Sequence, residues 1–192
     1  MSKLAKALLF MLAVTLAVIA SISGYNVGKQ TVYPVAYSDY IVKYAHKNGL
    51  DPFLVMAVIK QESNFVPEAA SDYAHGLMQI TPETAEWNAR AMGLTDYDYL
   101  EPETNIEIGC HYLAYLIDTY GNIDTALAAY NAGMGNVNSW LSDKAYSDDG
   151  ETLKYIPFPE TRSYVEKVNA SWDYYRTTDF ADLDEDKGKI SN

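Results

Sequence analysis

The sequence predicts a single, mainly α-helical (all-α) domain of six or seven short helices. The chain has 192 residues, the size of one domain with little room for a second. Apolar residues make up 48% and charged residues 21%, so a chain of this length can bury a core without disulfide bonds. Helix-start and helix-stop residues recur along it, and no alternating strand pattern of useful length competes with them.

Each expected helix is bounded by a capping residue, a proline in its first turn or a terminal glycine. The clearest apolar repeat has a period of three to four residues and ends at a glycine. The expected helices are, in order, 38–48 capped by Ser38 and ended by Gly49, 53–61 after Asp51-Pro52, 81–92 opened by Thr81-Pro82 and stopped by Gly93, 106–120 ended by Gly121, 124–130 begun by Asp124, and 159–176 opened by Pro159.

The first 24 residues predict a signal peptide or a signal anchor. Lys3 and Lys6 precede an apolar run from Ala7 to Ile22, and small residues follow it. This run is shorter than a full membrane span of about 20 residues, so cleavage and anchoring both stay open. In either case the rest of the chain crosses the membrane. The predicted parts are the export segment 1–24, a tether 25–36, the folded domain 37–177 and an acidic flexible tail 178–192.

Charge and cysteine content exclude several classes of function. A formal net charge of −12 and a pI near 4.5 argue against nucleic-acid binding, which needs a basic face. Cys110 is the only cysteine, so a disulfide scaffold is excluded. His46, His75, His111 and Cys110 are not spaced as metal ligands, so we expect no metal and no cofactor.

Glu62 is the candidate catalytic residue. The preceding segment, 53–59, is apolar on every helical face, so Glu62 is expected at the end of a buried helix. Desolvation and the negative end of the helix dipole both raise the pKa of its carboxyl, as a general acid near neutral pH requires. Taken alone, an exposed glutamate beside Lys60 is the simpler interpretation.

Two further segments combine glycines with groups suited to a ligand. The segment Gly76–Ile80 places a glycine and Gln79 at a helix entrance, where backbone and amide can approach a ligand. Tyr130 and Asn131 end a helix before Gly133 and suit sugar rings and hydroxyls. Taken singly, a tight turn is the better explanation of the first segment, and a glycine-capped helix end is the alternative explanation of the second.

The order and spacing of four segments are much more specific than any one of them. They are Glu62–Phe65, Gly76–Ile80, Ala129–Gly133 and Ile156–Val165. Together they closely resemble the catalytic domain of soluble lytic transglycosylases, peptidoglycan-cleaving enzymes with a goose-lysozyme-like fold. The resemblance runs from about Tyr37 to Tyr175.

The resemblance implies a lysozyme-like catalytic domain that cleaves the β-1,4 bond between N-acetylmuramic acid and N-acetylglucosamine without water. The product would carry a 1,6-anhydromuramoyl end, and Glu62 would act first as acid and then as base. The implied partners are peptidoglycan glycan strands and, if the export segment is uncleaved, the bacterial cytoplasmic membrane. We expect a monomer in the cell envelope. The implied substrate-binding residues are Ser63, Met78, Gln79, Tyr130, Asn131, Glu160 and Tyr164, with Glu160 the weaker assignment.

The residues are consistent with this chemistry. Glycosidases usually use two carboxylates, roughly 5–9.5 Å apart, whereas the motifs supply one acid in an apolar setting. A single carboxylate suits attack by a hydroxyl of the substrate itself. Two alternatives stay open: a hydrolytic muramidase in which Asp72, Glu83 or another acid positions water, and a non-catalytic cell-wall-binding module. The sequence departs from the family pattern at Met134, where many relatives have proline, and at the loop 72–75.

Overall fold

The computed structural model describes residues 11, 14–16 and 33–177. It divides into two compact units, residues 1–35 and 36–192. Most of the predicted export segment and tether and the whole predicted acidic tail lie outside the described residues. No helix among the residues described is long and apolar enough to cross a membrane.

The predicted mainly helical fold is confirmed for the second unit. Residues 33–177 contain seven helices and, in place of strands, only two isolated bridges, at Ala70–His75 and His75–Ile80. The helices are α2 (Ser38–Lys47), α3 (Pro52–Ser63), α4 (Pro82–Met92), α5 (Pro102–Tyr120), α6 (Ile123–Ala132), α7 (Met134–Leu141) and α8 (Pro159–Thr177).

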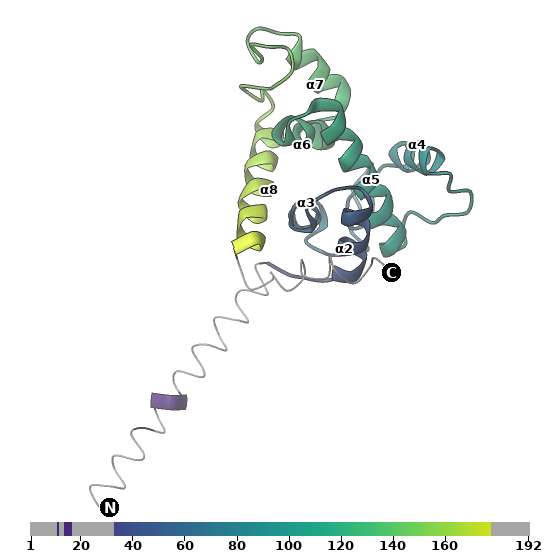
Figure 1. Ribbon diagram of the computed structural model, residues 1–192, viewed down its shortest axis with the longest axis vertical. Helices are drawn as coiled ribbons and strands as arrows, with labels where there is room; N and C mark the ends of the chain where they lie inside the picture. The colour runs from purple at the N-terminus through teal and green to yellow at the C-terminus, as the bar shows by residue number, and fades with distance from the viewer. Residues whose placement is uncertain (1–10, 12–13, 17–32, 178–192) are drawn as a thin grey trace, which may run out of the picture. The chain divides into compact units, whose positions relative to one another are not determined.

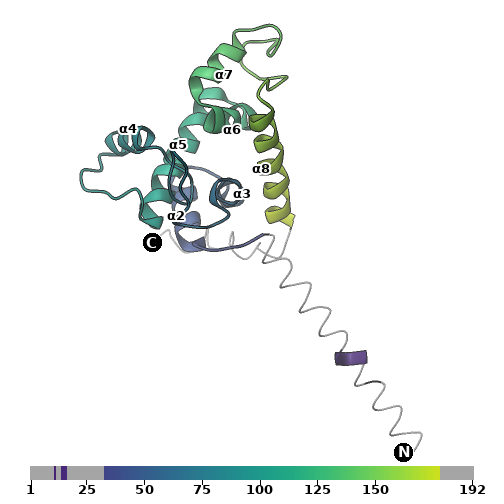
Figure 2. The same ribbon diagram turned by 180° about the vertical axis from the view of Figure 1, so that it is seen from behind.

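Helix α3 is the centre of the domain. It lies between α8 on one side and α2 and α5 on the other, as both ribbon views show (Figure 1, Figure 2). Every residue from Pro52 to Ile59 is buried, as its all-round apolarity predicts. Helix α6 packs against α5, α7 and α8, and α4 lies on the outer side of α5. The C-terminal end of α3 is less covered, since Gln61, Glu62 and Ser63 are partly exposed.

Local capping chemistry sets most of the helix ends. The carboxylate of Asp51 accepts the N–H of Phe53 at 2.9 Å, and Pro52 occupies the first turn of α3. Thr81 caps α4 in the same way. Helix α5 ends as expected at Gly121, whose φ of +62° is costly for residues with a side chain.

The expected cap of α2 and the expected first residue of α6 each differ from the structure by one residue. Helix α2 starts after Tyr37, which has a left-handed backbone (φ +59°), so Ser38 is the first helical residue rather than the cap. Helix α6 is capped by Asn122, whose side chain accepts the N–H of Thr125, and Asp124 lies inside its first turn. An acid two residues after a cap also suits the helix dipole, so the sequence pattern is ambiguous here.

Helix α7 is not among the helices assigned from sequence. Gly133 ends α6 and immediately precedes α7, so the glycine that predicts a helix end also begins the next helix. Val137 and Trp140 are buried three residues apart, and the Trp140 ring meets Phe158 edge-on at 4.9 Å. Packing therefore stabilises a glycine- and asparagine-rich segment that has low helix propensity by itself.

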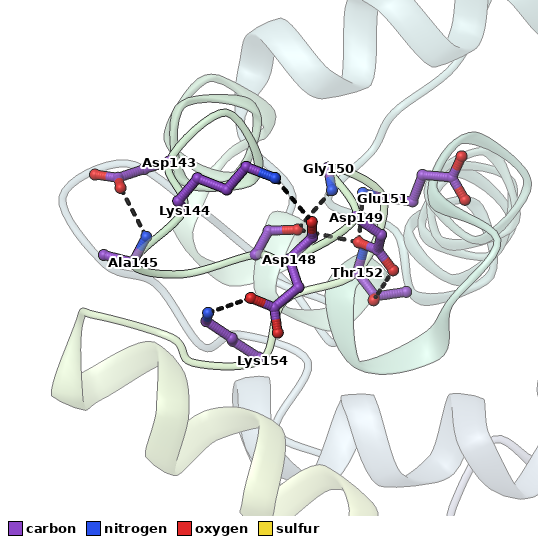
Figure 3. A network of polar contacts seen from close by, with 10 residues as sticks. Asp143, Lys144, Ala145, Asp148, Asp149, Gly150, Glu151, Thr152 and Lys154 are labelled. Carbon is purple, nitrogen blue, oxygen red and sulfur yellow. Dashed lines mark hydrogen bonds and ion pairs between the residues drawn. The ribbon is translucent and has the colours of Figure 1, made fainter.

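The loop between α7 and α8 is closed by short-range polar contacts (Figure 3). The Asp149 carboxylate accepts the backbone N–H groups of Glu151 and Thr152, each at 2.8 Å, and these bonds hold its pKa well below the usual range. Lys154 pairs with Asp148 nearby. This ordered loop leads directly into the start of α8.

Candidate active site

Glu62 lies in the last turn of α3 and is half-buried. Its Oε1 accepts a hydrogen bond of 2.7 Å from the Tyr164 hydroxyl of α8. Burial raises the pKa of the Glu62 carboxyl to about 7, and the bond from Tyr164 offsets part of that rise because it favours the charged form. The expected elevation of this pKa by desolvation is confirmed. At neutral pH the carboxyl therefore exists in both protonation states.

Tyr164 remains a hydrogen-bond donor throughout this range. Its side chain is buried, and burial together with the Glu62 charge raises the pKa of its hydroxyl well above 10. Tyr164 reaches Glu62 because α8 packs along α3. The resemblance placed a tyrosine near the catalytic glutamate, and the structure shows the two in contact.

A pocket of about 440 Å³ opens at this pair. It is formed by the ends of α3 and α6 and by one face of α8. Among the predicted site residues it brings together Glu62, Asn131, Glu160 and Tyr164. Its other lining residues were not predicted; the helical spacing from Glu160 could have indicated two of them, because residues three, four and seven apart share a face. Those other residues are Gln61, Ser163 and Lys167.

Ser63, which follows Glu62 in the chain, and Tyr130 both bond to the backbone of segment 76–80. The Ser63 hydroxyl donates to the Leu77 carbonyl at 2.8 Å, and the Tyr130 hydroxyl donates to the Met78 carbonyl at 2.8 Å. Burial, with the Glu62 charge as a further cause, raises the pKa of Tyr130 well above its usual value. Tyr130 is thus close to Glu62 and uncharged.

The same segment is tightly constrained. Gln79 has a left-handed backbone, and its side-chain N–H₂ donates to the carbonyls of Ala69 and Gly76, each at 2.9 Å. Met78 is fully buried and lies so close to Gly109 that any side chain at that position would collide with it. Neither Met78 nor Gln79 lines the Glu62 pocket, and their direct contact with a ligand stays a prediction.

Asn105 of α5 is a buried polar residue beside segment 76–80 that the sequence interpretation missed. It is fully buried; its Oδ1 accepts the N–H of Met78 at 2.8 Å, and its Nδ2 donates to the carbonyls of His75 and Tyr99. A Cβ on Gly76 would overlap the Asn105 side chain, so the glycine permits this close approach. The sequence signal that could have indicated Asn105 is its position as a polar residue directly before the apolar repeat of α5.

The two acids considered as a possible second carboxylate do not line the Glu62 pocket. Asp72 is exposed in the loop before Gly76, and Glu83 of α4 lines a different pocket. Glu160 is the other acid that lines the Glu62 pocket. In the described part of the chain, no three acidic, histidine or cysteine side chains are arranged to hold a metal ion.

Comparison with known proteins decides the family. The model of the transglycosylase SLT domain matches residues 39–153, more than half of the chain. The chain belongs to this family. The chain is 42% identical over 151 residues to the soluble lytic murein transglycosylase of Salmonella typhimurium, covering 75% of this chain and 23% of the relative.

Solved structures show the same fold. The lytic transglycosylase of Pseudomonas aeruginosa, described as an inactive mutant, matches with a TM-score of 0.69 and 34% identity over 77% of this chain and 25% of that one. The 70 kDa soluble lytic transglycosylase of Escherichia coli matches with a TM-score of 0.66 and 38% identity over 75% and 24%. The chain thus spans about a quarter of the length of each of these relatives.

Proposed function

We propose that this chain is a peptidoglycan lytic transglycosylase that cleaves between N-acetylmuramic acid and N-acetylglucosamine. One observation carries the proposal: the Glu62 carboxyl, which has a pKa of about 7 and is bonded to the Tyr164 hydroxyl, lines a 440 Å³ pocket. The relatives named lytic transglycosylases support it. A general acid that works near neutral pH needs such a pKa.

Glu62 supplies the proton in the first step. Tyr164 occupies Oε1, so the acidic proton resides on Oε2. Transfer of this proton to the glycosidic oxygen lets the C1–O bond break, and the departing sugar keeps the proton as a hydroxyl. The Tyr164 hydroxyl then stabilises the new Glu62 carboxylate, which carries the charge that develops in the transition state.

The second step needs no water. The 6-hydroxyl of the muramoyl residue attacks its own C1, and its proton passes to the Glu62 carboxylate. The 1,6-anhydro bond forms, and Glu62 returns to its acid form. A hydroxyl of the same sugar has a large proximity advantage over a free nucleophile. One carboxyl suffices for both steps.

The predicted substrate-binding residues divide into two groups under this proposal. Asn131, Glu160 and Tyr164 line the pocket and contact the sugar directly. The other four predicted residues hold segment 76–80 in place beside Glu62 through hydrogen bonds and packing. They are Ser63, Met78, Gln79 and Tyr130.

The substrate sets the place of action. Peptidoglycan lies outside the cytoplasmic membrane, and the segment 1–24 carries the basic and apolar pattern of export. We propose that the protein works in the cell envelope, either tethered by this segment or released after its cleavage.

The decisive experiment incubates the full chain with purified peptidoglycan and weighs the released fragments by mass spectrometry. We expect disaccharide-peptides lighter by one water than hydrolysis products, and none from Glu62→Gln. Glu166→Gln is the matched control, because Glu166 is an exposed acid on α8 that does not line this pocket. Hydrated reducing ends would instead identify a muramidase, with Glu160 as the first candidate for the second acid. No release from the unaltered chain would favour a binding module.

A further inference from the structure

The chain reverses direction immediately after Glu62. Helix α3 ends at Ser63, and the next two residues, Asn64 and Phe65, both have left-handed backbones, with φ of +50° and +64°. The N–H of Val66 donates to the Ser63 carbonyl at 3.1 Å. A hydrogen bond that spans four residues, with a positive φ at both central residues, is the pattern of a type I′ turn. A tight turn therefore follows the candidate catalytic acid directly.

Phe65 is an unusual residue for the second central position of such a turn. Type I′ turns favour asparagine followed by glycine, because glycine adopts a positive φ without a clash between side chain and backbone. Asn64 follows this preference, whereas Phe65 places a bulky aromatic residue where glycine is the unstrained choice. The left-handed backbone of Phe65 therefore costs free energy. Phe65 is only 7% exposed, and the burial of its side chain offsets that cost.

Most of the strained backbone lies beside Glu62. In the part of the chain that the structure describes, four residues other than glycine have a positive φ. They are Tyr37, Asn64, Phe65 and Gln79. The last three belong to two segments that are connected by the hydrogen bond from the Ser63 hydroxyl to the Leu77 carbonyl. Strain of this kind persists only where surrounding contacts enforce it, and it is typical of functional sites.

The turn sets how α3 ends around Glu62. The N–H of Asn64 closes the last helical bond, to the Lys60 carbonyl at 3.1 Å, and the N–H of Val66 closes the turn on Ser63. Glu62 lies between these two acceptors in the chain. With a negative φ at positions 64 and 65, the chain would leave the helix in another direction. The backbone that carries the Glu62 carboxyl therefore depends on the left-handed conformations that follow it.

We propose that Phe65 is a positioning residue for the cleavage reaction: its left-handed backbone holds the last turn of α3 so that the Glu62 carboxyl stays against the Tyr164 hydroxyl. This inference rests on the proposed function, since it concerns the same acid. Phe65 does not line the Glu62 pocket, so it acts through the backbone and not by touching the glycan. Its buried ring keeps the backbone left-handed, and a glycine at this position would adopt the same conformation without strain.

The test compares Phe65→Ala with Phe65→Gly in the full-length chain. Both variants lose the ring, but alanine resists a positive φ and glycine adopts it freely. At a temperature where both are folded, we expect kcat for peptidoglycan cleavage to fall about 10- to 100-fold in Phe65→Ala with little change in KM, and Phe65→Gly to recover most of the loss. Phe65→Gly should also melt about 2–4 °C above Phe65→Ala, the reverse of the order in an ordinary helix or strand.

A second pair of variants keeps the ring, in case its loss unfolds the chain. Asn64 is exposed, so its substitution leaves the core intact. Asn64→Val puts a β-branched residue at a positive φ and should lower kcat, whereas Asn64→Gly should keep it. Equal kcat in the unaltered chain and both strained variants, Phe65→Ala and Asn64→Val, would overturn the proposal. So would a Phe65→Gly variant that is folded and no more active than Phe65→Ala.

Tyr37 provides the matched control. It is also aromatic and has a φ of +59°, but it precedes α2 and does not line the Glu62 pocket. Tyr37→Gly should melt above Tyr37→Ala for the same reason as at position 65. Both Tyr37 variants should retain the kcat of the unaltered chain, because relief of strain at this position does not move Glu62. A kcat loss in Tyr37→Ala equal to that in Phe65→Ala would show a general effect of stability and overturn the positioning role.

Titration of the Glu62 carboxyl by carbon NMR separates this inference from the proposed function. Burial is the main cause that raises this pKa to about 7, so a loosened helix end that admits water should lower it towards the usual range of a glutamate. We expect that fall in Phe65→Ala and Asn64→Val, and a value near that of the unaltered chain in both glycine variants. An unchanged pKa in all four would overturn the inference. Absence of cleavage by the unaltered chain would reject the proposed function, and the titration would still decide whether Phe65 positions Glu62.

Discussion

At the scale of single residues, the proposed chemistry depends on one proton on Glu62. Burial raises the pKa of this carboxyl, and the Tyr164 hydroxyl lowers it, with a net value of about 7. Burial alone would keep the group protonated and make it a weak acid, whereas full solvation would leave it ionised at neutral pH. The Tyr164 hydrogen bond therefore lowers a carboxyl pKa that burial has raised.

The first prediction concerns the pH dependence of kcat/KM for peptidoglycan cleavage. The protonated form of Glu62 starts the reaction, so the rate should fall above about pH 7, approaching tenfold per pH unit. Tyr164→Phe removes the bond that favours the carboxylate, so the pKa rises and the descending limb moves to higher pH. The maximum should drop by about 10- to 100-fold, because a hydrogen bond to a charged group is lost.

The control for this profile is Tyr120→Phe, which removes a tyrosine hydroxyl bonded to Asn138 and not to Glu62. Its pH profile should match that of the unaltered protein. If the descending limb of the Tyr164→Phe pH profile stayed at the same pH or moved to lower pH, the Tyr164 bond would not lower the pKa of Glu62 as proposed.

At the scale of elements, segment 76–80 depends on one side chain of another helix. Asn105 makes three hydrogen bonds to backbone groups of Met78, His75 and Tyr99. Asn105→Ala leaves these groups without their partner in the protein interior, so we expect the free energy of unfolding to fall by about 2–4 kcal/mol. Urea denaturation measures it.

A second asparagine provides the comparison. Asn136 is exposed and donates one bond to the Ala132 carbonyl, so Asn136→Ala should change stability by about 0.5 kcal/mol or less. If both variants were equally stable, other contacts would hold segment 76–80. Peptidoglycan cleavage by folded Asn105→Ala should also decrease, because segment 76–80, to which Ser63 and Tyr130 bond, loses its fixed position.

Elements governed by local chemistry were predictable from sequence. Asp51 and Thr81 are followed directly by proline, and each cap bonds to a backbone N–H two or three residues away. The start of α2 was not predictable in this way, because Tyr37 adopts a left-handed backbone with no capping side chain. Helix α7 depends on the burial of Val137 and Trp140, which is a tertiary effect.

The same distinction applies to the site. The burial of α3 and the raised pKa of Glu62 follow from an unbroken apolar run, and the order of motifs indicated Tyr164. Asn105 was missed because its three partners come from two separate loops, which only the folded chain brings together.

At the scale of the whole domain, α3 and α8 act as one unit, since each carries half of the Glu62–Tyr164 pair. A contact at the other end of α3 connects the same helices. Asp51 caps α3 through Oδ1, while its Oδ2 accepts a bond of 2.8 Å from the Trp172 indole of α8 and lies 3.8 Å from Arg176. Hydrogen bonds therefore connect the two helices at both ends of α3. The bond from Trp172 to Asp51 lies at its start, and the bond from Tyr164 to Glu62 lies at its end.

Substitutions of Asp51 should separate the contribution of the α3 cap from that of the bond to Trp172. Asp51→Ala loses the cap and the bond to Trp172, and we expect a loss of about 2–3 kcal/mol in urea denaturation. Asp51→Ser keeps a good capping oxygen that is too short to reach Trp172, so it should recover about 1 kcal/mol of that loss. At temperatures where both variants are folded, both should cleave peptidoglycan more slowly, because α8 then holds Tyr164 less firmly against Glu62. Full activity in folded Asp51→Ser would show instead that the packing of α8 on α3 suffices to place Tyr164, and that the contact with Trp172 serves stability alone.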